Sequence, residues 1–215
     1  MSLSRIPKEL HAYVGERAAQ DDPFLVELKQ AAMTAGIPQI SIGAYQSAVM
    51  ATLLKLIGAR DVVEVGTLGG YSAIGMARAL PDGGRVRTIE LDPKHADFAE
   101  AWIAKSDVAN RVTVLRGAGK DVLPTIADRS ADAMFLDADK QGYSAYVEHA
   151  TRILRPGGLL MVDNAFAFNH LLDESVQEPD VLAIRALNDG LARHPRFEGA
   201  LLPVGDGMWM ARLRA

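Results

Sequence analysis

Acidic and amide side chains follow four of the predicted strands, at the points where the apolar runs end. They are Glu64, Glu90, Asp137 and the pair Asp163-Asn164. Ligands of open α/β sheets bind at the carboxyl ends of the parallel strands, so these groups should gather at one edge. Oxygens gathered in this way can bind a hard cation, a positively charged ligand or the hydroxyls of a sugar.

A glycine-rich turn follows the first predicted strand. The segment reads DVVEVGTLGGYS from Asp61 to Ser72, with glycines at positions 66, 69 and 70. Such a turn leaves backbone N–H groups facing a ligand. Glu64 lies just before the first glycine, where it would repel the pyrophosphate of a dinucleotide. The motif therefore favours a cationic ligand such as S-adenosylmethionine, although GxxGG also occurs in ordinary strand-to-helix turns.

Glu90 ends the apolar strand TIELD, about 20 residues after the glycine turn. At this spacing a carboxylate at the tip of the second strand accepts hydrogen bonds from ribose hydroxyls. The alternative is a solvated acid in a loop. We favour the ribose role because the residue ends a clean apolar strand in the expected β–α unit.

Asp137, Asp163 and Asn164 form the predicted metal site. Two carboxylates and an amide oxygen from neighbouring strand tips suit Mg²⁺, with Mn²⁺ or Ca²⁺ as alternatives. Zinc is disfavoured, because the five histidines show no paired metal spacing and the chain has no cysteine. In the competing interpretation, one aspartate caps a helix and the other anchors a turn. Lys140 would act as a base if a nearby divalent ion disfavours its protonated form, and is otherwise an ordinary solvated lysine.

The elements that must position these residues follow from the hydrophobic periodicity. Helical spacing covers residues 3–57. The predicted strands that follow are 61–65, 85–91, 111–116, 132–137 and 158–163, with helices at 71–80, 93–106, 119–127, 141–154 and 179–193. A long loop follows residue 163, and FEGALLPV and GMWMARLR predict a terminal hairpin. Repeated β–α units with nearly continuous apolar strands predict a parallel sheet covered on both faces.

Length and composition limit the class of protein. The chain has 215 residues, of which 49% are hydrophobic and 23% charged, as expected for one soluble globular domain. Its net charge of −4 argues against general nucleic-acid binding. The N-terminus has no signal-peptide core, and no apolar run reaches the roughly 18 residues of a membrane span, so the expected location is the cytoplasm without membrane contact.

Six motifs in this order resemble the metal-dependent, S-adenosylmethionine-dependent O-methyltransferases, which include the catechol and caffeoyl-CoA O-methyltransferases. The motifs are EVGTLGGYS, TIELD, RGAGKDVLP, FLDADKQGY, MVDN and DGMWMAR, and the likeness covers about residues 35–215. The resemblance implies an α/β fold with a Rossmann-like, doubly wound, mostly parallel seven-stranded sheet, a C-terminal antiparallel hairpin and extra N-terminal helices. It also implies a single domain over 1–215, with a helical cap at 1–57 and a Rossmann-like core at 58–215.

The resemblance assigns roles to individual residues. The residues implied for the cofactor are Ile42, Glu64, Gly66, Thr67, Ser72, Glu90, Leu91, Ala118, Gly119 and Asp137. Within this set, Glu64 to Ser72 would hold the methionine part, Glu90 the ribose, and Ala118 and Gly119 would border the adenine. Asp137, Asp163 and Asn164 match the metal ligands. Lys140 matches the proposed catalytic base, and Asp137 would take part in catalysis beside it.

Two segments depart from the family pattern. The chain reads Ser47-Ala48 where the family usually has Gly-Gln, which puts the contribution of that segment in doubt. After MVDN, many relatives have a tryptophan or another bulky residue and then a glycine, whereas this chain has AFAFNH. Phe166, Phe168 and His170 are candidates for an aromatic acceptor pocket, with core packing as the alternative for the phenylalanines. Trp209 is expected in the core.

Three functions remain open at this point. The first is methyl transfer to a hydroxyl of a catechol-like aromatic small molecule, and the second is methylation of a hydroxylated uridine in transfer RNA. The third is nucleotide binding without catalysis, against which Glu64 and the acidic metal set argue. Bacterial relatives are often dimers, so a homodimer is expected.

Overall fold

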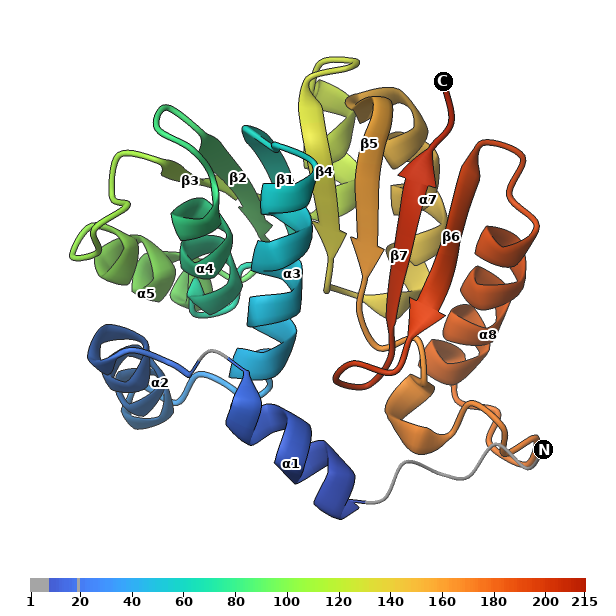
Figure 1. Ribbon diagram of the computed structural model, residues 1–215, viewed down its shortest axis with the longest axis horizontal. Coiled ribbons are helices and arrows are strands. Elements are labelled where there is room, and N and C mark those ends of the chain that lie inside the picture. Colours follow the sequence, from blue (N-terminus) through green and yellow to red (C-terminus); the bar gives the residue numbers. More distant parts are fainter. Residues whose placement is uncertain (1–7, 19) are drawn as a thin grey trace.

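The computed structural model describes residues 8–18 and 20–215 (Figure 1). Residues 3–7 and 19 of the predicted helical segment lie outside this part. Three helices precede the sheet: α1 (Lys8–Arg17), α2 (Pro23–Thr34) and α3 (Ala44–Leu56). Helix α2 begins at Pro23 because Asp22 caps it, its carboxylate accepting the Leu25 N–H at 2.9 Å.

One mixed sheet of seven strands has the order β3-β2-β1-β4-β5-β7-β6. The strands are β1 (Asp61–Val65), β2 (Arg85–Glu90), β3 (Val112–Arg116), β4 (Ala131–Leu136), β5 (Leu154–Val162), β6 (Phe197–Leu202) and β7 (Met208–Leu213). Strands β1 to β5 are parallel, and β7 runs antiparallel to both β5 and β6. The predicted fold class, including the antiparallel C-terminal hairpin, is confirmed.

Helices cover the two faces of the sheet. Helix α3, α4 (Tyr71–Ala79) and α5 (Pro93–Ile103) pack on one face. The other face carries α7 (Tyr143–Ile153) and α8 (Pro179–Ala192), and Figure 1 shows α3 in front of the sheet and α7 behind it. Successive side chains of β1 lie on opposite faces of the sheet. Val62 packs in the core on the α3 side, and Val63 packs in the core on the α7 side. Burial on both faces explains why the parallel strands are almost continuously apolar.

Two predicted elements differ from the structure by more than a shift of a few residues at an end. The predicted helix 119–127 is a short α6 (Gly119–Val122) followed by a 3-10 turn, because Pro124 has no N–H to continue the helical hydrogen bonds. Strand β5 begins at Leu154 rather than at residue 158. Ala131 pairs with Leu154 but Ala133 with Leu159, so residues 155–158 form an irregularity within the strand. None of the helices in the described residues is long and apolar enough to cross a membrane.

Candidate active site

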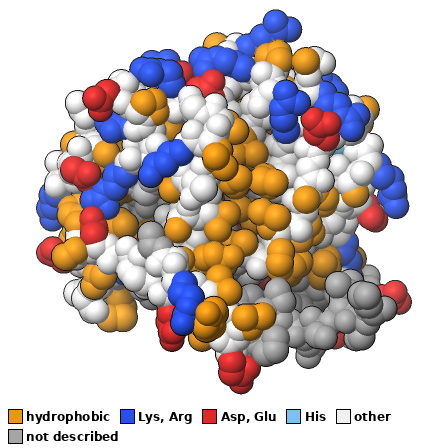
Figure 2. All heavy atoms as spheres, in the orientation of Figure 1, with side chains coloured by type: hydrophobic (Ala, Val, Ile, Leu, Met, Phe, Trp, Pro, Cys, Tyr) orange, Lys and Arg blue, Asp and Glu red, His pale blue; other side chains and the backbone are white. Residues whose placement is uncertain are grey.

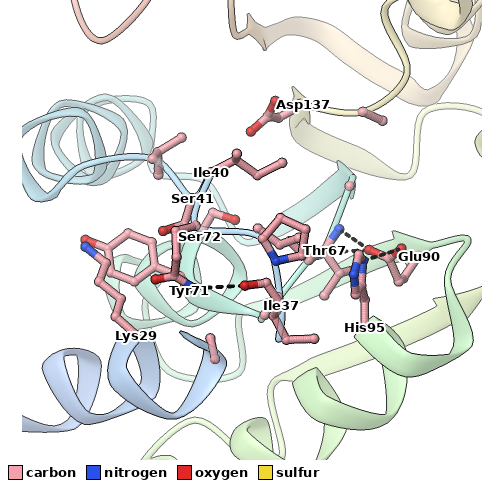
Figure 3. A pocket seen from close by; sticks show the side chains of 18 of the residues that line it. Lys29, Ile37, Ile40, Ser41, Thr67, Tyr71, Ser72, Glu90, His95 and Asp137 are labelled. Carbon is pink, nitrogen blue, oxygen red and sulfur yellow. Dashed lines mark hydrogen bonds and ion pairs between the residues drawn. The ribbon is translucent and has the colours of Figure 1, made fainter. Parts of the chain in front are cut away.

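A cavity of about 370 Å³ lies at the carboxyl ends of the central strands (Figure 3). The predicted residues that line it are Ile42, Gly66, Thr67, Ser72, Glu90, Asp137, Lys140 and Asn164. A smaller cavity of about 120 Å³ contains Leu91, Ala118 and Gly119, and it shares Gly66 and Ala138 with the larger one. Glu64 and Asp163 line neither cavity and are buried behind the walls. The fold thus brings the predicted residues to one edge of the sheet.

The glycine turn is closed against the tip of β4. Gly66 has a φ of +102°, and a Cβ at this position would lie 1.9 Å from the backbone oxygen of Asp137. The Gly66 N–H donates to the Ile89 carbonyl at 2.9 Å, which ties the turn to β2. Gly70 starts α4 with a φ of +84°. Glycine at position 66 therefore lets the chain pass between two neighbouring strand tips.

Gly66→Ala should destabilise the protein and damage the cavity. The added methyl group would overlap a backbone oxygen in a left-handed conformation, at a combined cost of about 2–5 kcal/mol. We expect a clear fall in the melting temperature and weaker binding of S-adenosylhomocysteine. Gly190→Ala is the control, since a Cβ there meets nothing within 4 Å. An unchanged melting temperature and affinity in Gly66→Ala would contradict the packing described here.

Glu90 holds the glycine turn in place. Its Oε2 accepts the N–H groups of Thr67 at 3.1 Å and Leu68 at 2.8 Å. Its Oε1 accepts the N–H of Asp92 at 2.9 Å, and Nδ1 of His95 lies 3.7 Å from the same oxygen. A carboxylate has about four acceptor sites, so capacity for a ribose hydroxyl remains. The structural role of Glu90 was not predicted, and the ribose contact stays a prediction.

Glu64 is fully buried behind Ser72. The Ser72 hydroxyl donates to Oε1 of Glu64, whereas Oε2 has no hydrogen-bond partner among the described residues. Burial raises the pKa of Glu64 to about 8, and the hydroxyls of Ser72 and Thr88 offset part of this effect. A cation placed beside Ser72 would favour the ionised form. Glu64 can therefore recognise a cationic ligand through the serine that separates it from the cavity.

Ligand binding should release a proton from Glu64. The pKa of about 8 means that the carboxyl is mostly protonated near pH 6.5 in the free protein, and an adjacent ammonium group should lower that pKa. We expect net proton release on binding of S-adenosylhomocysteine at pH 6.5, measured by calorimetry in buffers of different ionisation enthalpy. Glu64→Gln should release fewer protons. Equal release in both proteins would show that Glu64 does not ionise on binding.

Lys140 is held between two other polar side chains. Its Nζ donates to Oδ1 of Asp137 at 3.1 Å and to the hydroxyl of Tyr143 at 2.8 Å. Lys140 is only 9% exposed, which contradicts the alternative of a solvated lysine. Burial raises the pKa of Tyr143 well above its usual value, and Asp137 and Asp163 add to the effect, so Tyr143 remains a neutral phenol. The role of Tyr143 in the site was not predicted, although its position one helical turn after Lys140 could have indicated it.

Two of the predicted metal ligands, the carboxylates of Asp137 and Asp163, repel each other. Burial raises the pKa of Asp163 to about 6, and the negative charge of Asp137 adds to this effect. Oδ1 of Asp163 is buried without a hydrogen-bond partner in the described part of the chain. No cluster of three or more His, Cys, Asp or Glu that could bind a metal occurs in residues 8–18 and 20–215. An ion here would therefore need the amide oxygen of Asn164, and the repelling carboxylates with the unpaired oxygen fit a divalent cation.

Helix α2 covers the cavity from one side. Lys29 and Leu28 of this helix line it, as do residues 37–41 that follow. The Tyr71 hydroxyl at the start of α4 donates to Oδ1 of Asp21, and Nζ of Lys29 lies 2.7 Å from Oδ2 of the same aspartate. Figure 3 shows Lys29 beside the Tyr71 ring. These contacts hold the helical cap against the cofactor side of the sheet.

Only one of the three candidates for the acceptor pocket lines the cavity. Phe168 is 47% exposed and reaches the cavity wall, while its N–H donates to Oδ2 of Asp206 at 2.7 Å. Phe166 packs on the backbone of Gly207, and His170 is not part of the lining. Trp209 is buried and donates to Oδ1 of Asn188 at 2.6 Å, as expected of a core residue.

Comparison with known proteins identifies the family. A family model described as O-methyltransferase matches residues 15–214. The chain belongs to the O-methyltransferase family. Among its relatives, a catechol O-methyltransferase of Mycobacterium tuberculosis is 37% identical over 94% of this chain and 92% of that protein. A catechol O-methyltransferase of Niastella koreensis is 35% identical over 97% of this chain and 98% of that protein.

A solved structure shows the same fold. The O-methyltransferase from Bacillus cereus, in complex with SAH, is 34% identical and superposes with a TM-score of 0.88 over 96% of this chain and 97% of that one. The predicted family and the predicted class of enzyme are thereby confirmed. The roles of individual site residues stay predictions.

Proposed function

We propose that this O-methyltransferase transfers the methyl group of S-adenosylmethionine to a hydroxyl of an aromatic vicinal diol, with the help of a divalent metal ion. The single observation that carries the proposal is the position of Lys140, whose Nζ lies 3.1 Å from Oδ1 of Asp137 on a wall of the cavity that also includes Asn164. A proton acceptor beside hard oxygen ligands suits the ionisation of a hydroxyl.

The cofactor would occupy both cavities. Ser72, with Glu64 behind it, favours the ammonium group of the methionine part. Glu90 retains acceptor capacity for the ribose. The smaller cavity, with Leu91, Ala118 and Gly119, offers space for the adenine. The related O-methyltransferase from Bacillus cereus, whose structure is a complex with SAH, supports binding of such a cofactor.

Asp137, Asp163 and Asn164 would hold the metal ion. A bound divalent ion would supply positive charge that favours ionisation of an adjacent hydroxyl. In its neutral amine form Lys140 would take up the hydroxyl proton at Nζ, which Asp137 and Tyr143 keep in place. The oxygen then forms a bond to the methyl carbon as the bond from sulfur breaks. The protein contributes mainly alignment, an effect worth up to about 7–11 kcal/mol in favourable cases.

An apolar mouth suits an aromatic acceptor. Ile40 and Phe168 line the cavity and are 72% and 47% exposed, so both offer apolar surface to a ligand. The curated relatives named catechol O-methyltransferase support a vicinal diol. The cationic lining residues Lys29 and Lys140 are each paired with an aspartate, so the cavity lining itself favours a small neutral acceptor over a phosphate backbone.

A panel of acceptors tests the proposal. Catechols, caffeoyl esters, matched monophenols and transfer RNA carrying hydroxyuridine would each be incubated with S-adenosylmethionine and Mg²⁺. We expect methylation of vicinal diols and much slower reaction of monophenols. Turnover of the transfer RNA alone would support the second function, and binding of S-adenosylhomocysteine without turnover of any acceptor would contradict the proposed substrate class.

We also propose a homodimer through the α3 face, meaning the outward side of α3 around Tyr45, Val49, Leu53 and Leu56. Figure 2 shows a band of hydrophobic side chains on this side of the molecule. Leu56 is 77% exposed, and an open groove of about 480 Å³ includes the other three residues. A single exposed leucine needs no explanation, but a continuous apolar patch is typical of an interface.

Light scattering after gel filtration tests the dimer. We expect a mass of about twice 23.1 kDa. Leu56→Glu should shift the protein towards the monomer, because a charge in an apolar interface loses its hydration. Leu172→Glu is the control, since Leu172 is exposed in the loop after β5. A monomeric wild-type protein at micromolar concentration would contradict the interface.

A further inference from the structure

A buried glutamine on α3 lies behind the predicted metal ligands. Gln46 is 3% exposed, and its Nε2 has no hydrogen-bond partner among the described residues. Oδ1 of Asp163 is also buried and unpaired there. An unpaired buried donor and an unpaired buried acceptor each cost about 1–3 kcal/mol, so two such groups close together call for an explanation.

The two groups act on each other. The Gln46 amide lies next to the Asp163 carboxylate. Both are beside the turn between β6 and β7: Gly205 approaches the Gln46 amide, and the Gly207 carbonyl accepts the N–H of Ala165 at 2.9 Å, two residues after Asp163. Nε2 of Gln46 and Oδ1 of Asp163 are nevertheless both left without a hydrogen-bond partner among the described residues.

The hairpin between β6 and β7 supports Gln46 from the other side. A Cβ at Gly205 would lie 2.1 Å from Oε1 of Gln46, so the backbone of the turn approaches the amide closely. Gly205 has a φ of +59°, a conformation that glycine adopts without strain. The amide is thus confined between the turn and Asp163.

We propose that Gln46 is a positioning residue for Asp163, whose N–H group pairs with Oδ1 and orients the carboxylate towards a divalent ion. The inference rests on the proposed function, because it assumes that Asp163 is a metal ligand. An amide suits this position because it donates a hydrogen bond without adding a positive charge that would compete with the ion. Hydrogen-bond partners of metal ligands typically contribute 10- to 100-fold to metal affinity.

Binding of Mn²⁺, followed by electron paramagnetic resonance, tests the role of Gln46. Gln46→Met keeps the length of the side chain and removes the donor, and it should raise the Kd for Mn²⁺ by about 10- to 100-fold. The affinity for S-adenosylhomocysteine should stay within about twofold, because Gln46 does not line the cavity. In turnover assays the Mg²⁺ concentration for half-maximal rate should rise, while kcat at saturating Mg²⁺ changes little.

Two further variants make the test specific. Thr52→Val on the same helix is the control, since in the described part of the chain the exposed Thr52 hydroxyl donates only to the Ala48 carbonyl. Gly205→Ala should also weaken Mn²⁺ binding, because the added methyl group would displace the amide.

Three results would contradict the roles proposed for Gln46 and the metal site. Mn²⁺ affinity in Gln46→Met equal to that of the wild type would overturn the positioning role, and so would an equal loss of Mn²⁺ and S-adenosylhomocysteine binding. Absence of Mn²⁺ binding in the wild-type protein would instead overturn the metal site of the proposed function.

Discussion

Replacing Asp137 with alanine should abolish specific Mn²⁺ binding and lower kcat/KM by about 10³-fold or more. The variant removes one of only two carboxylates in the predicted metal site, and it also removes a hydrogen-bond partner of Lys140 at 3.1 Å. Charge stabilisation by a metal ion is worth several kcal/mol, and each 1.36 kcal/mol corresponds to a factor of ten in rate. Steady-state kinetics with a catechol acceptor measure the loss.

Asp180→Ala is the matched control for this variant. Asp180 is exposed at the start of α8, and among the described residues its side chain accepts a hydrogen bond only from Nε2 of Gln141, at 3.2 Å. It should retain wild-type turnover and Mn²⁺ binding. An Asp137→Ala enzyme that still binds Mn²⁺ at one specific site would show that the ion is held elsewhere.

Lys140→Met should lower kcat by about 10²- to 10⁴-fold, the range expected for loss of a positioned proton acceptor. The methionine side chain can occupy the buried space but cannot take up a proton. Binding of S-adenosylhomocysteine and Mn²⁺ should be retained, because the predicted ligands remain. Rapid-mixing measurement of a single turnover separates the chemical step from product release.

Lys120→Met, at an exposed position on α6, is the control for Lys140→Met. Tyr143→Phe should cause a smaller loss than Lys140→Met, since it removes one of two contacts that place Nζ. Unchanged kcat in Lys140→Met would assign proton removal to solvent or to another group and would leave the metal site intact.

Much of the fold could be predicted because its strands are buried on both faces. Apolar runs such as β1 and β4 have few alternatives to a central parallel strand. The irregular start of β5 could not be predicted, since Pro156 and two glycines within a run are normally the sign of a turn. The pairing of β5 with β4 decides its boundary, and pairing is a property of the folded chain.

The site was predictable where its residues end strands. Asp137 and Asn164 line one cavity because the carboxyl ends of neighbouring parallel strands meet. Lys29, His95 and residues 37–41 were missed, although they also line it. Their positions depend on how α2 and α5 pack against the sheet, which hydrophobic periodicity does not specify.

Residues that make buried polar contacts were the other class that the sequence did not reveal. Tyr143 and Gln46 lie on helical segments that were recognised from the spacing of their apolar residues. That spacing does not indicate that a polar side chain also faces inward. Glu90 was recognised, but its hydrogen bonds to Thr67 and Leu68 follow from the shape of the turn and not from the acid itself. Hydrogen-bond partners that lie far apart in the chain become evident only when the strands are in register.

The most direct measurement is the initial rate of catechol methylation at saturating S-adenosylmethionine, after removal of metal with EDTA and again after Mg²⁺ is restored. We expect turnover with Mg²⁺, almost none in EDTA, and full recovery when the ion is added back. Turnover that is equally fast in EDTA would contradict metal-dependent methyl transfer at the site formed by Asp137, Asp163 and Asn164.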